Sequence, residues 1–180
     1  MKTLLLMKHA ESSWVNNLQD DWYRPLSENG IMHAFDFGEL LTIQNLVPDL
    51  ILASSAVRNH QTAKIVSNRF DRPCKLLSLD NLYLAEMEVY FQEIQRVPDT
   101  VRTLLVVGHC PSLNRILQVI TERIEAIPIS GAAHIMVGIN SWKDFKYDVQ
   151  GELVDLIKVT PPFQFFKNYR VVAGTATSRL

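Results

Sequence analysis

The amino-acid sequence predicts an α/β fold, a three-layer sandwich with a mainly parallel central sheet. Short apolar runs alternate with longer segments of helical periodicity along the chain, and such alternation favours right-handed crossovers between parallel strands. The runs at 3–7, 50–53 and 103–107 are almost continuously apolar, as strands are when helices cover both faces of a sheet. The length of 180 residues and the hydrophobic fraction of 47% fit one domain with its own core.

Six segments are expected to form strands. Besides the three runs above, these are 75–79, 134–139 and a weaker pattern at 153–159. Because no repeat or interdomain linker interrupts the pattern, residues 1–160 are expected to form a single domain. Residues 161–180 are expected to be a C-terminal tail, partly docked through its phenylalanines, Phe163, Phe165 and Phe166.

Four segments between the strands are expected to be helical. Ser27 precedes the first, which carries Ile31 and Phe35 on one face and ends before Pro48. The second begins near residue 57, and the third covers 86–97. Pro111 stands where a proline at the first helical position would begin the fourth.

The composition excludes several classes of protein. With 18 basic and 19 acidic residues, interspersed along the chain, the net charge of −1 gives no footprint for nucleic acid. No run approaches the ~20 apolar residues of a membrane span. The two cysteines, Cys74 and Cys110, have neither a disulfide-scaffold pattern nor metal-ligand spacing, which is typical of a reducing compartment. The expected location is therefore cytoplasmic, with no membrane partner.

The predicted strand ends carry the residues with chemistry. Lys8 and His9 follow the first strand, Ser54 and Arg58 follow the second, and His109 follows the fourth. Ligands of open parallel sheets bind outside the carboxyl ends of the strands, so these side chains are expected to converge on one edge. Imidazoles, cations and helix N-termini together suit a phosphate-like dianion.

This set of residues can perform covalent phosphoryl transfer. A neutral imidazole can attack phosphorus and form a phosphohistidine, which water then hydrolyses. Arg58 can donate two hydrogen bonds to equatorial oxygens, while Lys8 acts as a point charge. Such chemistry requires no metal and no cofactor. A metal site made of His9, His109 and Glu11 is disfavoured, because the neighbouring cations would repel the metal.

Several ordered motifs resemble those of the histidine phosphatase superfamily, and most closely its small SixA-like branch, typified by phosphohistidine phosphatase. The resemblance covers about residues 3–160. The motifs that carry it are Leu4-Leu5-Leu6-Met7-Lys8-His9-Ala10-Glu11-Ser12, Arg24-Pro25-Leu26-Ser27-Glu28-Asn29-Gly30, Pro48-Asp49-Leu50-Ile51-Leu52, Ser54-Ser55-Ala56-Val57-Arg58-Asn59-His60-Gln61-Thr62-Ala63 and Val106-Val107-Gly108-His109.

The resemblance implies a histidine phosphatase (phosphoglycerate mutase-like) fold and a role for individual residues. It implies that His9 is the nucleophile and that Arg58 and His109 bind the phosphoryl group, with Lys8 in the place of the family's first arginine. Arg24 falls in a matching stretch and is a further candidate phosphate ligand.

Two assignments stay open. Ser54 is expected to cap a helix, to bind phosphate, or to do both. The proton donor to the leaving group is either Glu86, in the region where the wider superfamily has an acidic residue, or Asp21, just before the Arg24 motif.

The expected function is metal-independent phosphatase activity on a phosphorylated substrate, with protein phosphohistidine, such as that of a phosphotransfer domain, as the preferred class. One alternative is a small-molecule phosphomonoester phosphatase. Another is a non-catalytic phospho-ligand binding protein. It is suggested by Lys8, which lacks the bidentate fork of arginine, and by Cys110, which replaces the asparagine usual in this branch. Cys110 beside positive charge is also expected to be oxidation-sensitive.

The other histidines, His33, His60 and His134, are expected to be structural. The aromatic residues Trp14 and Trp22 lie with Tyr23 in a polar segment. Local packing is the favoured explanation for them, and a rim that contacts a protein substrate is the alternative.

Overall fold

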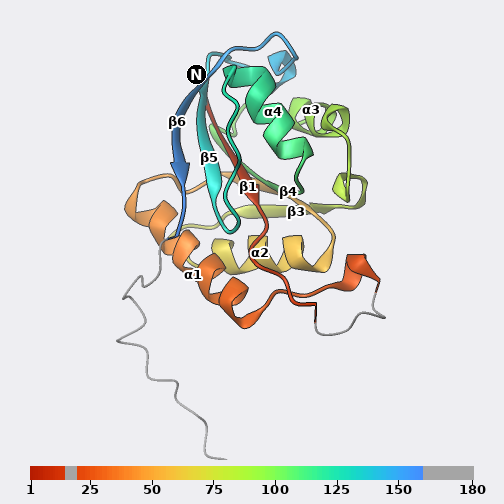
Figure 1. Ribbon diagram of the computed structural model, residues 1–180. Helices are drawn as coiled ribbons and strands as arrows, with labels where there is room; N and C mark the ends of the chain where they lie inside the picture. The colour runs from red at the N-terminus through yellow and green to blue at the C-terminus, as the bar shows by residue number, and fades with distance from the viewer. Residues whose placement is uncertain (15–19, 160–180) are drawn as a thin grey trace, which may run out of the picture.

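A computed structural model describes residues 1–14 and 20–159, which form a six-stranded sheet between two layers of helices (Figure 1). The strands are β1 (Lys2–Lys8), β2 (Leu50–Ser54), β3 (Lys75–Leu79), β4 (Thr103–Gly108), β5 (Ala132–Val137) and β6 (Gly151–Ile157). The α-helices are α1 (Glu28–Ile43), α2 (Val57–Ser67), α3 (Met87–Gln95) and α4 (Ser112–Thr121). Short 3-10 helices are η1 (Asp21–Tyr23), η2 (Asp80–Leu82) and η3 (Trp142–Asp144).

The sheet is mostly parallel, as predicted. Its order is β3-β2-β4-β1-β5-β6, and the pairs β1–β4, β2–β4 and β2–β3 are all parallel. The exceptions are β5, which pairs antiparallel with β1, and β6, which pairs antiparallel with β5. The carboxyl ends of β1, β2 and β4 therefore meet at one edge of the sheet, where a ligand site is expected.

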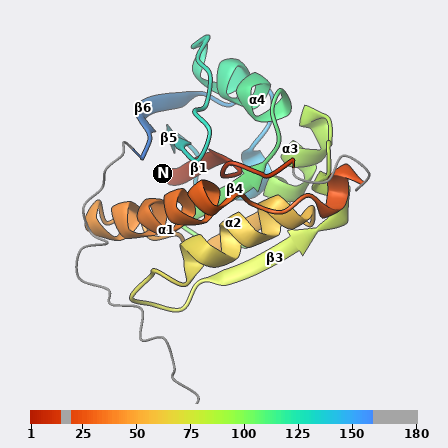
Figure 2. The ribbon, with the colours of Figure 1, turned by 60° about the horizontal axis from the view of Figure 1, so that its bottom comes forward.

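The apolar strands are buried on both faces, as their composition predicted. Along β1, Leu4 and Leu6 face the core that includes α3 and α4, whereas Leu5 and Met7 face the core that includes α1 and α2. In Figure 2 the helices α1 and α2 lie together in front, and α3 and α4 lie beyond the sheet. The predicted three-layer sandwich is thus confirmed.

The start of α1 explains why a serine and a glycine stand close together in its motif. The Ser27 hydroxyl accepts a hydrogen bond from Gly30 N at 3.0 Å, so Ser27, which was expected to precede this helix, is its N-cap. A Cβ at Gly30 would collide with the carbonyl oxygen of Glu11, so only glycine lets the helix approach this backbone. The start of α1 is thereby packed against the main chain of Glu11, which lies two residues after His9 in the sequence.

The remaining boundaries differ slightly from the predictions. Pro111 stands one residue before α4, which begins at Ser112, and Glu86 is the N-cap residue of α3. The predicted C-terminal tail, 161–180, lies outside the described residues. Within the part of the chain that the structure describes, no helix is long and apolar enough to cross a bilayer.

Candidate active site

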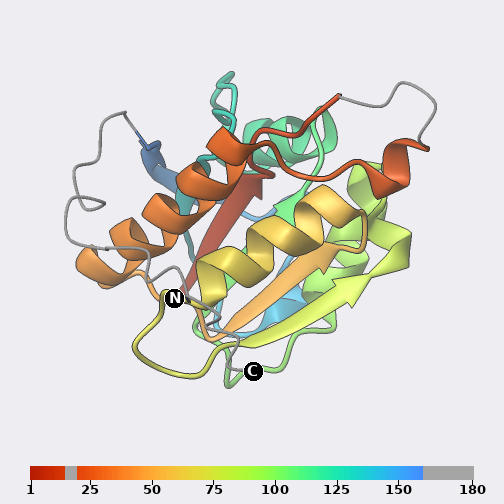
Figure 3. The same cartoon turned by 90° about the horizontal axis from the view of Figure 1, so that it is seen from below.

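The ends of two neighbouring strands bring two histidines together. Lys8 of β1 and Gly108 of β4 are partners in the parallel register, so His9 and His109 leave the sheet side by side. Their ring centroids lie 5.8 Å apart, at an interplanar angle of 63°. Figure 3, seen from below, shows the arrowheads of β1 (red), β2 (orange) and β3 (yellow-green) pointing toward the same side of the molecule.

His9 is held as a neutral imidazole with one nitrogen free of a proton. Its Nδ1 lies 2.8 Å from the carbonyl oxygen of Ala10, and because a carbonyl only accepts, Nδ1 carries the proton. Nε2 accepts a hydrogen bond of 3.3 Å from Arg58 Nε. Burial, together with the charges of Arg58, Arg24 and Lys8, lowers the pKa of His9 from 6.5 to about 4. Nε2 therefore presents a lone pair at neutral pH.

His109 is oriented by three neighbours. Its main-chain N–H donates to the Tyr90 hydroxyl at 3.2 Å, and its Nε2 lies 2.9 Å from Ser54 Oγ. Its Nδ1 lies 3.4 Å from Arg58 Nη2, which donates. Burial, then the charges of Arg58 and His9, lower the pKa of His109 to about 3. Both imidazoles are thus neutral.

Ser54 lies behind His109 and not at the open side of the site. Its side chain is fully buried, so it can influence a bound phosphoryl group only through the His109 ring. Nor does it cap α2, which begins at Val57 with Ala56 at the N-cap position. The two roles expected for Ser54 are therefore replaced by orientation of His109.

Arg58 connects both histidines to Asp21. Its side chain is 2% exposed. One fork of the guanidinium, Nε and Nη2, faces His9 Nε2 and His109 Nδ1. The other fork donates from Nη1 to the main-chain oxygen of Asp21 at 2.7 Å and from Nη2 to Asp21 Oδ2 at 2.9 Å. Arg58 is thus at the centre of the cluster, as predicted.

Helix α2 also holds the two histidine segments in place. The Asn59 amide donates to Gly108 O at 3.0 Å. The Thr62 hydroxyl accepts from Ala10 N at 3.0 Å and donates to Arg58 O at 2.7 Å. These buried hydrogen bonds fix the main chain at Gly108 and at Ala10, and thereby hold both histidine segments beside Arg58.

Asp21 and Arg24 join the cluster from the segment beside η1. Arg24 Nε lies 3.3 Å from Asp21 Oδ1, and the Arg24 guanidinium stacks 3.8 Å from the centroid of the Trp14 ring. Burial alone would raise the pKa of Asp21, but the hydrogen bond from Tyr83 and the charges of Arg58 and Arg24 outweigh it and hold that pKa below its usual range. Asp21 is therefore ionised at neutral pH and has no proton to donate in this state.

Glu86 is not brought into this cluster. Its side chain is 76% exposed and lies 3.9 Å from Arg115 Nη1. Of the two candidate proton donors, the structure thus places Asp21 among the site residues and turns Glu86 toward solvent and α4.

Lys8 and Cys110 flank the histidines. Within residues 1–14 and 20–159, the Lys8 ammonium makes no hydrogen bond or ion pair, although its charge contributes to lowering the pKa of His9. The Cys110 thiol lies 3.4 Å from Asn114 Oδ1. Burial raises the pKa of the Cys110 thiol despite the charge of Lys8, so the positive charge does not make this thiol acidic, and its sensitivity to oxidation stays a prediction.

Tyr83 belongs to the site although it was not among the residues predicted from the sequence. Its hydroxyl donates to Asp21 Oδ2 at 3.0 Å, its ring meets His109 edge-on with centroids 5.6 Å apart, and Trp22 packs against it at 4.6 Å. Tyr83 follows the carboxyl end of β3 at the same sheet edge, so the rule that located the histidines could also have found it.

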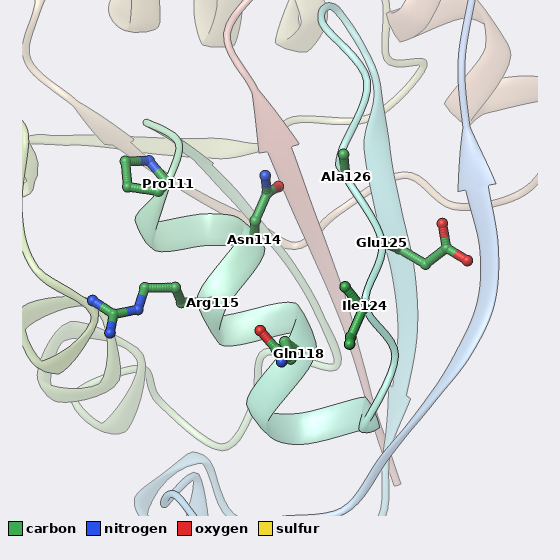
Figure 4. Close-up of a pocket in the computed structure, with 7 residues that line it drawn as sticks. All are labelled: Pro111, Asn114, Arg115, Gln118, Ile124, Glu125 and Ala126. Atoms are coloured by element: carbon green, nitrogen blue, oxygen red, sulfur yellow. The ribbon is translucent and has the colours of Figure 1, made fainter.

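A groove runs along α4 (Figure 4). It has a volume of about 350 Å³, with one wall on α4 and the other on the segment after it. In the close-up, Ile124 and Ala126 point toward the helix, whereas Arg115 points away from that segment. The lining residues are Pro111, Asn114, Arg115, Gln118, Ile124, Glu125 and Ala126.

The arrangement suits a tetrahedral dianion. Arg58, Arg24 and Lys8 supply positive charge around the unprotonated Nε2 of His9, and fixed charges of this kind can stabilise a transition state that spreads negative charge over three oxygens. Among the described residues, no group of three His, Cys, Asp or Glu side chains could hold a metal ion.

Known proteins with similar sequences and folds point in the same direction. The profile of the "Histidine phosphatase superfamily (branch 1)" matches residues 4–102. An uncharacterized protein of Mycobacterium tuberculosis is 34% identical over 149 residues, which cover 77% of this chain and 90% of the relative.

Solved structures extend the likeness to the whole fold. A candidate phosphohistidine phosphatase SixA from Agrobacterium tumefaciens is 27% identical, with a TM-score of 0.69, over 74% of this chain and 90% of that one. The protein histidine phosphatase SixA complexed with tungstate has a TM-score of 0.74 over 87% and 96% of the two chains; at 18% identity it supports the fold alone. The chain belongs to the histidine phosphatase superfamily, branch 1.

Proposed function

We propose that this protein is a metal-independent phosphatase that works through a phosphohistidine formed on His9 Nε2. The observation that carries the proposal is the state of His9. Its Nδ1 proton is committed to the carbonyl of Ala10, and its Nε2 lone pair points at Arg58. A nucleophile and its phosphate-binding cation are thus already paired.

The reaction has two steps. In the first, a phosphoryl oxygen replaces His9 as the acceptor of the Arg58 Nε–H bond, Nε2 attacks phosphorus, and the bond from phosphorus to the leaving group breaks. In the second, water attacks the phosphohistidine, the P–N bond breaks, orthophosphate leaves and neutral His9 returns. Arg58, Lys8 and Arg24 balance the negative charge. His109 donates from Nδ1 to a phosphoryl oxygen in the tautomer that carries its proton on Nδ1, in which the Ser54 hydroxyl donates to Nε2.

The substrate class that fits best is phosphohistidine on a protein, such as a phosphotransfer domain. An ionised Asp21 and an exposed Glu86 give no ready acid for a poor leaving group. A phosphoramidate needs less help, because its nitrogen is easily protonated. The candidate SixA structure from Agrobacterium tumefaciens has the same architecture. Trp14, 66% exposed and stacked on Arg24, provides a surface for a bulky partner.

The groove on α4 favours a second candidate, a small-molecule phosphomonoester phosphatase. Its volume of about 350 Å³ falls in the usual range for ligand pockets, and its lining includes Pro111, which follows His109 by two residues in the sequence. The third candidate, a phospho-ligand binding protein without turnover, rests on Lys8 and Cys110.

Hydrolysis of an aryl phosphate in EDTA tests the chemistry. Wild type is compared with His9→Ala and with His33→Ala, a control histidine on α1. Turnover that survives in His33→Ala and vanishes in His9→Ala supports the proposal, and acid-labile, base-stable labelling of His9 would identify the intermediate. Phosphate binding without turnover, with activity gained in Lys8→Arg, would favour the binding protein.

Leaving-group dependence tests the substrate class. We expect a phosphohistidine protein to be hydrolysed at a higher kcat/KM than an alkyl phosphate, which needs a proton donor. If alkyl phosphates are good substrates, Asp21→Asn and Glu86→Gln identify the donor, because only loss of the acting acid should lower the turnover of alkyl phosphates more than that of aryl phosphates, whose leaving group needs no proton. A preference for alkyl phosphates would favour the small-molecule candidate.

A further inference from the structure

Tyr83 connects two parts of the site. It follows η2 directly, and its hydroxyl donates to Asp21 Oδ2 at 3.0 Å. The edge of its ring meets the His109 ring at 82°, with centroids 5.6 Å apart, while Trp22 packs against it at 4.6 Å. These contacts place the hydroxyl at the Asp21 carboxylate and restrict the ring to one orientation.

Asp21 in turn determines the direction of Arg58. Both its main-chain oxygen and Oδ2 accept from the end of the guanidinium, at 2.7 Å and 2.9 Å. A guanidinium is planar and its donors have fixed directions. When Asp21 holds one fork, the other fork must therefore point at His9 Nε2 and His109 Nδ1, where the phosphoryl group of the proposed reaction would bind.

We propose that Tyr83 is a positioning residue, whose hydroxyl holds the Asp21 carboxylate on one fork of Arg58 and thereby aims the other fork at the phosphoryl group. This inference rests on the proposed function, since it concerns the same phosphoryl site. Tyr83 acts through Asp21 and does not itself bind the phosphoryl group. Arg24 retains the second carboxylate oxygen at 3.3 Å, so removal of the Tyr83 hydroxyl should loosen Asp21 without releasing it.

Tyr83→Phe isolates this role, because it keeps the ring contacts with His109 and Trp22. The direct readout is solvent exchange of the Arg58 Nε–H, observed by ¹H–¹⁵N NMR without substrate and assigned by its absence in Arg58→Lys. We expect exchange to become about threefold to tenfold faster, the effect of losing one hydrogen bond from the network. The kcat for an aryl phosphate should fall by a similar factor.

A double-variant cycle tests whether Tyr83 acts through Asp21. In an Asp21→Ala background, which removes the acceptor of the Tyr83 hydroxyl, Tyr83→Phe should change neither the exchange rate nor kcat by more than about twofold. Tyr147→Phe is the matched control: Tyr147 stacks on Phe91 at 4.6 Å and its hydroxyl interacts with Glu88, outside the site. This variant should match wild type in both measurements.

The inference is overturned if Tyr83→Phe leaves the Arg58 Nε–H exchange unchanged, or if its effect is equally large with and without Asp21. The NMR measurement needs no turnover. An absence of catalysis in wild type would therefore refute the proposed function while the exchange data still decide whether Tyr83 positions Arg58.

Discussion

The burial of His9 and His109 as neutral rings should make the fold less stable at acid pH. In the unfolded chain a histidine titrates near 6.5, whereas the folded pKa values are about 4 for His9 and about 3 for His109. Between these values the unfolded chain binds protons that the folded chain does not. The contribution of the two neutral rings to the free energy of unfolding is therefore fully present above about pH 6.5. It is lost as the pH falls toward about 4 for His9 and about 3 for His109.

The loss can be calculated for His9 alone. With a folded pKa of about 4, lowering the pH from about 8 to about 5 should cost about 2 kcal/mol of unfolding free energy. That is a substantial part of the ~5–15 kcal/mol of a typical domain. The cost belongs to the same desolvation that keeps Nε2 unprotonated, as the proposed nucleophile must be.

Urea unfolding of wild type and His9→Ala at both pH values measures this contribution. His9→Ala removes the titrating ring, so its stability should fall by about 2 kcal/mol less than that of wild type over this interval. Leu113→Ala is the control, since it opens a cavity in the core of α4 and removes no titrating group. An equal pH dependence in wild type and His9→Ala would refute the buried, neutral state of His9.

Three further predictions concern the shell around the histidines. Lys8→Arg keeps the charge and adds a bidentate fork, so tungstate, measured by calorimetry, should bind about threefold to tenfold more tightly. Ser54→Ala leaves His109 Nε2 buried without its partner at 2.9 Å and should cost about 1–3 kcal/mol in urea unfolding while lowering kcat. In Gly108→Ala, the new Cβ would lie 2.5 Å from the Tyr90 hydroxyl, which should destabilise the fold by about 1–3 kcal/mol in thermal unfolding; Tyr90→Phe should restore part of this.

The strands and the positions of His9 and His109 could be predicted from the sequence because each leaves a local signal. Leu4, Leu5 and Leu6 are consecutive apolar residues that only a strand covered on both faces can bury. His9 and His109 come directly after such strands, so the parallel sheet brings these two residues to one edge regardless of the direction of their side chains.

The roles of Ser54, Glu86 and Asp21 could not be predicted, because they depend on side-chain directions. Ser54 turns inward to His109. Glu86, seven residues after the end of β3, faces α4 and solvent. Asp21 reaches Arg58 across 37 residues of sequence. No periodicity or motif encodes which oxygen meets which fork of a guanidinium.

Helix α2 shows how structure and chemistry are coupled here. A helix buried against a sheet usually presents an apolar face, yet α2 buries Arg58, Asn59 and Thr62. Buried polar groups are tolerated when hydrogen-bonded. Arg58 uses both of its forks, Asn59 binds the backbone before His109, and Thr62 binds the backbone after His9. The polar face of α2 is thus explained by the site itself, because this one helix supplies Arg58, the proposed phosphate-binding cation, and holds both histidine segments against it.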